Sequence, residues 1–143
     1  MEEVTKSKTL KRESVTDTIE IKVKKTPFSD LDDEVKLAIE SASEKKAEDV
    51  VVLDLRPITS FTEFFVIAGG TNHRHVQAIA DEITQKLKSQ FKLTPIRIEG
   101  YAKADWILLD FGDFVAHVFN EKSRSFYDLE RLWRDANVVE LAA

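Results

Sequence analysis

The sequence predicts an α/β fold in which helices flank a mixed, mainly five-stranded sheet. Five short segments have the apolar, β-branched or alternating character of strands, and three other segments repeat apolar residues at helical spacing. Along the chain the order is helix, strand, strand, helix, strand, strand, strand and a short helix. With 143 residues, 43% of them hydrophobic, the chain can bury the core of one domain of ordinary size.

The beginning of the chain differs in composition from the rest. Residues 1–28 are rich in Lys, Glu, Ser and Thr and hold few large hydrophobes, too few to offset the entropy lost on ordering. We therefore expect a flexible N-terminal tail over 1–28 and a single domain over 29–143. Within the tail, Ile19, Ile21 and Val23 alternate with charged residues, so a short edge strand is the alternative to disorder there.

The first part of the domain is predicted to contain two helices and three strands. Both helices carry their apolar residues on one stripe, and Asn72 is a natural N-cap for the second. The strand that begins at Asp49 is apolar almost throughout, as expected for a central strand buried on both faces. The expected elements are a helix over 30–47, strands over 49–55 and 64–68, a helix over 73–90 and a strand over 96–99.

A β-hairpin is predicted from Trp106 to Phe119 around a Gly112-Asp113 turn, because a two-residue turn of this type fixes the register of its strands. One face is wholly apolar and suits a core; it consists of Ile107, Leu109, Phe111, Phe114, Ala116 and Val118. The other face mixes large hydrophobes with a carboxylate and an imidazole; it consists of Trp106, Leu108, Asp110, Val115, His117 and Phe119. Such a mixture is unusual both for a core and for a solvent face, so we expect this face to be exposed and to bind a partner.

The last predicted element is a helix from Ser125 onward. Apolar side chains recur there at helical spacing and are expected to pack on the sheet; they are Phe126, Leu129, Leu132 and Trp133. Tyr127 lies off this stripe and would extend the exposed face of the hairpin.

Composition excludes several classes of protein. The net charge of -5 argues against bulk electrostatic coating of nucleic acid, so no direct DNA binding is expected. The absence of cysteine excludes thiol catalysis and cysteine metal sites. No segment approaches the ~20 apolar residues of a membrane span, and no signal peptide is evident, so we expect a cytoplasmic protein without membrane association.

Few residues suggest catalysis or a cofactor. His73 and His75 are two apart at a helix start and therefore point in different directions, which disfavours a metal pair. The Gly69-Gly70-Thr71-Asn72 segment could bind an anion at a helix start, or form only a turn and a cap. No cofactor or metal is expected.

Nucleotidyltransferases also place Gly and a hydroxyl residue before a helix, but they need paired carboxylates on the next strand to hold magnesium. Here that strand offers only Glu99, with Arg97 where a second acid would stand. Asp54 could be catalytic, or could pair with Arg56. We therefore predict a protein that is not an enzyme. The alternative hypothesis is a nucleotidyltransferase-like enzyme that acts on nucleotides or RNA.

Three segments resemble the ribosomal silencing factor family, also called the Iojap or RsfS family. They are VVVLDLRPITSFTEFFVIAGGTNHRHVQAIADEI, GYAKADWILLDFGDFVAHVF and RSFYDLERLWRDA, which begin at Val50, Gly100 and Arg124. The resemblance covers about residues 31–136 and leaves the tail unmatched.

The resemblance implies a non-enzymatic factor that binds the large ribosomal subunit through its fourteenth protein and sterically blocks joining of the small subunit, which represses translation. It also implies a fold similar to nucleotidyltransferases without their catalytic acids, and a homodimer. The positions that match the family's partner-binding surface are Trp106, Leu108, Asp110, His117, Phe119 and Tyr127. The same hairpin face could instead form the dimer interface, and the sequence leaves both possibilities open.

Overall fold

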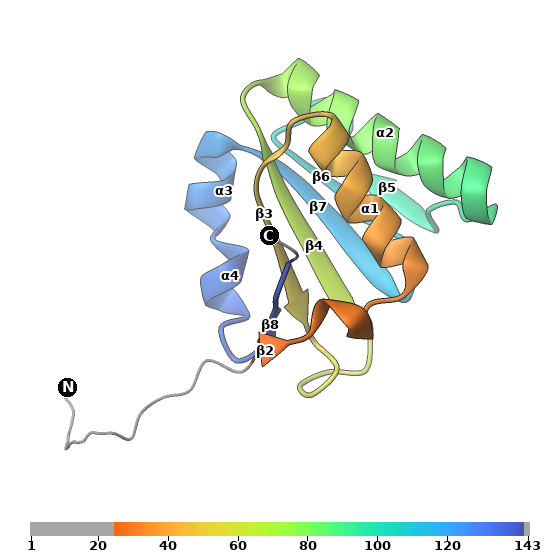
Figure 1. Ribbon diagram of the computed structural model, residues 1–143. Coiled ribbons are helices and arrows are strands. Elements are labelled where there is room, and N and C mark those ends of the chain that lie inside the picture. Colours follow the sequence, from red (N-terminus) through yellow and green to blue (C-terminus); the bar gives the residue numbers. More distant parts are fainter. Residues whose placement is uncertain (1–24, 142–143) are drawn as a thin grey trace.

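The computed structural model describes residues 25–141, which form one mixed sheet covered by helices on both faces (Figure 1). Seven strands are hydrogen-bonded in the order β2-β8-β3-β4-β7-β6-β5. The elements are β2 (Lys25–Thr26), η1 (Phe28–Asp30), α1 (Asp33–Glu44), β3 (Glu48–Asp54), β4 (Phe64–Gly70), α2 (His73–Phe91), β5 (Arg97–Glu99), β6 (Trp106–Asp110), β7 (Phe114–Asn120), α3 (Glu121–Tyr127), α4 (Leu129–Leu132) and β8 (Asn137–Val139).

The α/β class and the mixed sheet are as predicted, but the expectation of five strands is wrong. The two additional strands are β2 and β8, which contain two and three residues. Strands this short show no period in the sequence, so pattern analysis could not find them. Strand β2 pairs with β8 in parallel orientation, and β8 also pairs with β3 in antiparallel orientation.

Strand β4 lies at the centre of the sheet, and all seven of its residues are buried. It pairs antiparallel with β3 and parallel with β7. We expected β3 to be the strand buried on both faces, but its first four residues are not fully buried. The apolar run of β3 therefore identified a strand correctly but not the middle of the sheet.

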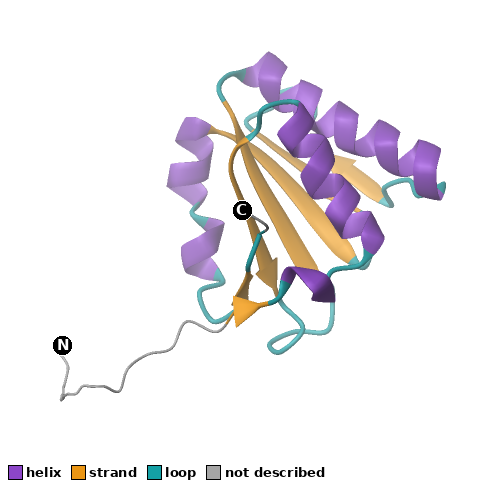
Figure 2. Cartoon of the chain, viewed as in Figure 1, coloured by secondary structure: helices purple, strands orange, loops and turns teal. Residues whose placement is uncertain are grey.

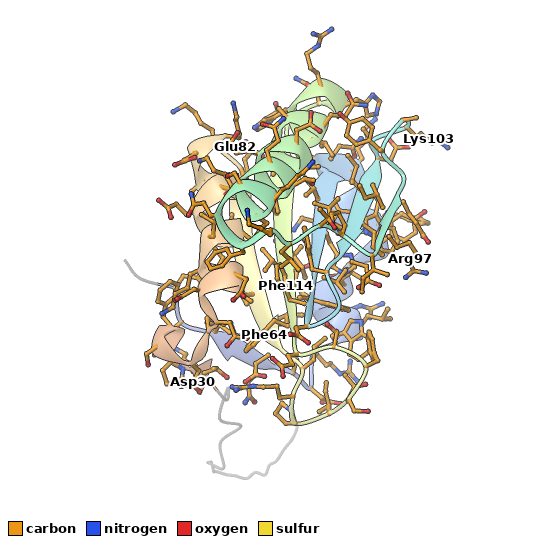
Figure 3. The ribbon with its side chains drawn as sticks, turned by 90° about the vertical axis from the view of Figure 1, so that its right-hand side faces the viewer. Asp30, Phe64, Glu82, Arg97, Lys103 and Phe114 are labelled. Carbon is orange, nitrogen blue, oxygen red and sulfur yellow. The ribbon has the colours of Figure 1, made fainter. Side chains whose placement is uncertain are left out.

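The helices α1 and α2 cover one face of the sheet and enclose the larger core, as the layered arrangement in Figure 2 shows. Helix α2 buries the five residues of its predicted stripe, which are Val76, Ile79, Ala80, Ile83 and Leu87. Its predicted N-cap is confirmed, because Asn72 Oδ1 accepts a 2.8 Å hydrogen bond from the backbone N–H of His75. Phe64 and Phe114 contribute to the same core and lie between helices and sheet in Figure 3.

The hairpin has the predicted register. Trp106 pairs with Phe119, Leu108 with His117 and Asp110 with Val115. Gly112 supplies the positive φ angle of the turn, at +91°. The core face of the hairpin is also confirmed, because all six of its apolar residues are buried against α1 and α2.

The C-terminal helix is broken, which changes the face it presents. Asp128 adopts the left-handed conformation, with φ +47°, and separates α3 from α4. Of the predicted stripe, Leu129 is buried and Trp133 is partly buried, but Phe126 and Leu132 are 81% and 73% exposed. The expectation that all four pack on the sheet is therefore wrong.

The described structure includes the last four residues of the predicted tail. Residues 25–28, which we assigned to it, contain β2 and the start of η1, and the Thr26 side chain is buried. The remaining tail residues, including Ile19, Ile21 and Val23, lie outside the described part of the chain. Among residues 25–141, no helix has the length and apolar character needed to cross a bilayer.

Candidate partner-binding face

The second face of the sheet carries a smaller core covered by the C-terminal segment. Its buried members are Leu53, Leu55, Phe65, Ile67, Val115, Phe119, Leu129 and Ala136. We expected the mixed hairpin face to be open, but this is wrong for its β7 half. Phe119 is fully buried, with the rings of Trp106 and Tyr127 packed on it, and His117 is 4% exposed, in contact with the rings of Phe65 and Trp106. Neither side chain is available to touch a partner directly in this conformation.

The part of the hairpin face that remains accessible comes from β6 and is continued by α3. Trp106 and Leu108 are partly exposed, and Tyr127 is 47% exposed. Trp106 stacks on Phe119, with ring centroids 4.9 Å apart, and also packs on Tyr127, with centroids 4.7 Å apart. We call the accessible residues Trp106, Leu108 and Tyr127 the β6–α3 surface.

His117 lies beneath this surface and bonds to it. Its Nδ1 accepts a 3.0 Å hydrogen bond from the indole N–H of Trp106, so the ring proton of a neutral His117 is on Nε2. That Nε2 is buried and has no hydrogen-bond partner among the described residues. A buried donor left without an acceptor costs about 1–3 kcal/mol. Burial lowers the pKa of His117 to about 3, so the ring stays neutral at physiological pH.

Asp110 is at the end of β6 and already has two contacts within the chain. One carboxylate oxygen accepts a 2.9 Å hydrogen bond from the backbone N–H of Gly112, which closes the hairpin turn. The other oxygen lies 3.6 Å from Arg97 Nη2, longer than a good hydrogen bond. Figure 3 shows Arg97 on the side of the sheet away from α1 and α2. Asp110 is therefore held in place, with one oxygen open to a further donor.

An aromatic group that was not predicted lies beside the β6–α3 surface. Phe61 packs against Trp133 with ring centroids 5.9 Å apart, and Phe65 lies 5.5 Å from Trp133 and 4.5 Å from His117. Phe61 is in a loop, where no hydrophobic period could indicate its direction. An open hollow of about 450 Å³ lies along α3 and α4; its lining includes Phe126, Tyr127, Arg131, Leu132 and Arg134.

Asp54, the candidate catalytic acid, has a structural role. It is buried, and its two carboxylate oxygens accept hydrogen bonds from Thr26 Oγ1 at 2.6 Å and from the Arg56 side chain at 2.9 Å. Burial alone would raise the pKa of this carboxyl, but the hydrogen bonds from Arg56 and Thr26 outweigh it and hold the pKa below its usual value. The carboxylate is thus already occupied by groups of the chain.

The start of α2 is also occupied by the chain itself. His75 Nδ1 accepts the backbone N–H of Thr71 at 3.0 Å, and His75 Nε2 lies 2.7 Å from the carbonyl oxygen of Lys45. His73 points elsewhere, to Asp105 at 2.9 Å. A Cβ added at Gly70 would lie 2.8 Å from Val76, so this glycine allows close packing of strand and helix. Turn and cap therefore explain the segment better than an anion site.

The described residues contain no group of three or more His, Asp or Glu side chains placed to hold a metal ion. Strand β5, which follows α2, has Glu99 as its one acidic residue. The Glu99 carboxylate forms an ion pair with the Arg97 guanidinium at 3.3 Å. The likeness of the fold to nucleotidyltransferases stays a prediction.

Comparison with known proteins gives a consistent result. A family model described as "Ribosomal silencing factor during starvation" matches residues 29–143. The chain is 43% identical to "Ribosomal silencing factor RsfS" of Halalkalibacterium halodurans over 107 residues, which cover 75% of this chain and 91% of that protein. It is 29% identical over 116 residues to "Mitochondrial assembly of ribosomal large subunit protein 1" of Mus musculus, covering 77% of this chain and 51% of that protein. A crystal structure from Chromobacterium violaceum is similar, with a TM-score of 0.69 and 32% identity, over 78% of this chain and 88% of that one.

Proposed function

The chain belongs to the ribosomal silencing factor family, and on this basis we propose that it binds the large ribosomal subunit and represses translation. Family membership confirms the expectation of a regulator that is not an enzyme. The name of the mouse relative, which refers to assembly of the large subunit, supports the choice of that subunit. A cytoplasmic site of action goes with this proposal.

The contact we propose is with the fourteenth protein of the large subunit, at the face where the small subunit would dock. Occupation of that face would block subunit joining sterically, without any chemical step. The observation that carries the proposal is the β6–α3 surface, where Trp106 and Tyr127 expose aromatic area while they pack on each other and Trp106 stacks on the buried Phe119. Aromatic side chains held in this way are typical anchors of protein interfaces.

The predicted binding residues have different roles in this proposal. Trp106, Leu108 and Tyr127 are the apolar anchors, while Asp110 accepts a hydrogen bond from a basic group of the partner. Phe119 and His117 support the anchors from beneath, because both are buried. The net charge of -5 suits a basic partner, since complementary charge speeds association.

Co-sedimentation with separated ribosomal subunits tests the proposal. The wild-type protein should pellet with large subunits and not with small ones. Trp106→Ala should weaken binding by a factor on the order of 30, the equivalent of ~2 kcal/mol for a buried anchor. Phe91→Ala is the control, because Phe91 is an exposed aromatic at the end of α2, which covers the other face. Retention of Trp106→Ala at the wild-type level would exclude the anchor.

We also propose that the protein forms a homodimer, which could use the same surface. The molar mass of Trp106→Ala in solution separates the two uses. Dissociation of a wild-type dimer by this substitution would assign the surface to self-association. A dimer that stays intact but no longer binds large subunits would assign it to the ribosome.

A further inference from the structure

We propose that His117 is a positioning residue: its Nδ1 fixes the indole of Trp106 so that Trp106 presents only carbon atoms to a partner. The proposal rests on the function proposed above and describes how the β6–α3 surface selects what it binds. It assigns His117 a role other than direct contact.

The hydrogen bond between Trp106 and His117 uses the one polar atom of the indole. Trp106 and His117 lie on neighbouring strands, and the indole N–H points inward to Nδ1 at 3.0 Å. A tryptophan side chain has one donor and no acceptor. Because its donor is used within the chain, the accessible part of Trp106 has no polar atom left to offer.

His117 is a polar side chain in a buried position. A purely apolar side chain would fill the same buried place without leaving a donor unpaired, yet His117 keeps a buried Nε2 with no partner among the described residues. A packing role alone would favour leucine or phenylalanine here. The useful atom of this histidine is therefore Nδ1, which is the atom bonded to Trp106.

Two aromatic contacts also restrict the indole of Trp106. Phe119 stacks on the indole of Trp106 and Tyr127 packs on it at a tilt, which restricts the ring plane. These contacts alone would still permit the indole to make half a turn about its Cβ–Cγ bond, which keeps the plane and reverses the direction of the N–H. The hydrogen bond from the indole N–H fixes its direction. Together these contacts hold Trp106 in one orientation before binding, which reduces the entropy lost when a partner docks.

The partner group that contacts the accessible edge of Trp106 is therefore apolar. An aliphatic or aromatic side chain placed over the accessible edge of Trp106 would bury carbon against carbon. A partner group that needed the indole N–H would have to break the bond to His117 and leave Nδ1 buried without a donor.

Two substitutions of His117 separate positioning from packing. His117→Asn keeps an acceptor oxygen close to the place of Nδ1, whereas His117→Leu fills space without an acceptor. We expect His117→Leu to bind large subunits about tenfold more weakly than the wild type, and His117→Asn to stay within about threefold of it. Equal affinity of His117→Leu and wild type, or equal losses in both variants, would overturn the proposal.

Hydrogen exchange of the Trp106 indole N–H, measured by NMR on protein with Trp133→Phe, gives a readout that does not depend on ribosomes. The chain has two tryptophans, so this background leaves one indole signal. Exchange should be slow with His117 or His117→Asn and at least tenfold faster with His117→Leu. Fast exchange in the His117 protein would overturn the positioning even if both variants failed to fold. Slow exchange in a protein that does not pellet with large subunits would instead refute the proposed function and leave the positioning intact.

Discussion

Trp106 and Tyr127 pack ring against ring with centroids 4.7 Å apart, so that strand β6 and helix α3 meet in one aromatic contact. The contact joins a strand of the hairpin to the first C-terminal helix, so Tyr127 continues the hairpin face as the sequence predicted. It also means that the proposed binding surface is one unit, in which removing either ring changes the environment of the other.

A double-mutant cycle tests this unity. Trp106→Ala and Tyr127→Ala should each weaken binding to large subunits, by about 2 and about 1 kcal/mol. The double variant should lose about 1 kcal/mol less than the sum, because each single change already disrupts the same aromatic pair. Dissociation constants measured by fluorescence titration would show the coupling. Strictly additive losses would mean that the two rings act independently.

Strand register was the part of the site that the sequence could specify. A two-residue turn at Gly112-Asp113 leaves no freedom in pairing, so the partners of Trp106 and Asp110 were predictable. What covers a face depends on contacts distant in sequence, and the positive φ at Asp128 turned α4 away from the direction that helical spacing implied. Leu132 is therefore exposed in α4, although helical spacing placed it on the same stripe as the buried Leu129.

The broken helix predicts unequal roles for two leucines of α4. Leu129 is buried in the smaller core, and Leu132 is mostly exposed. We expect Leu129→Ala to lower the free energy of unfolding by about 2–4 kcal/mol, since it leaves a cavity. Leu132→Ala is the matched control and should change it by about 0.5 kcal/mol or less. Urea denaturation of both variants measures the difference, and equal losses would contradict the described direction of α4.

The network around Asp54 predicts a change in stability without a change in binding. Asp54→Asn weakens the charged hydrogen bonds with Arg56 and Thr26 and should lower the free energy of unfolding by about 2 kcal/mol. Asp49→Asn in the same strand is the control, because Asp49 is exposed and asparagine tolerates its φ of +48°. Thermal and urea denaturation measure both effects.

Asp54→Asn should also pellet with large subunits as the wild type does. Magnesium-dependent nucleotide transfer by the pure wild-type protein, abolished by this substitution, would contradict the structural role and support the enzyme alternative.

The buried His117 predicts how stability depends on pH. Its pKa is lowered to about 3 in the folded protein, against about 6.5 for an unfolded chain. Between these values the unfolded state binds one more proton than the folded state, so stability is lost as pH falls below about 6.5. From about pH 7 to about pH 5.5 this histidine should cost about 1 kcal/mol of unfolding free energy. The His117→Leu variant should lack this pH-dependent loss. The difference in unfolding free energy between variant and wild type should therefore change by about 1 kcal/mol between the two pH values. Urea midpoints at the two pH values measure it, and a constant gap would show that His117 titrates normally in the folded protein.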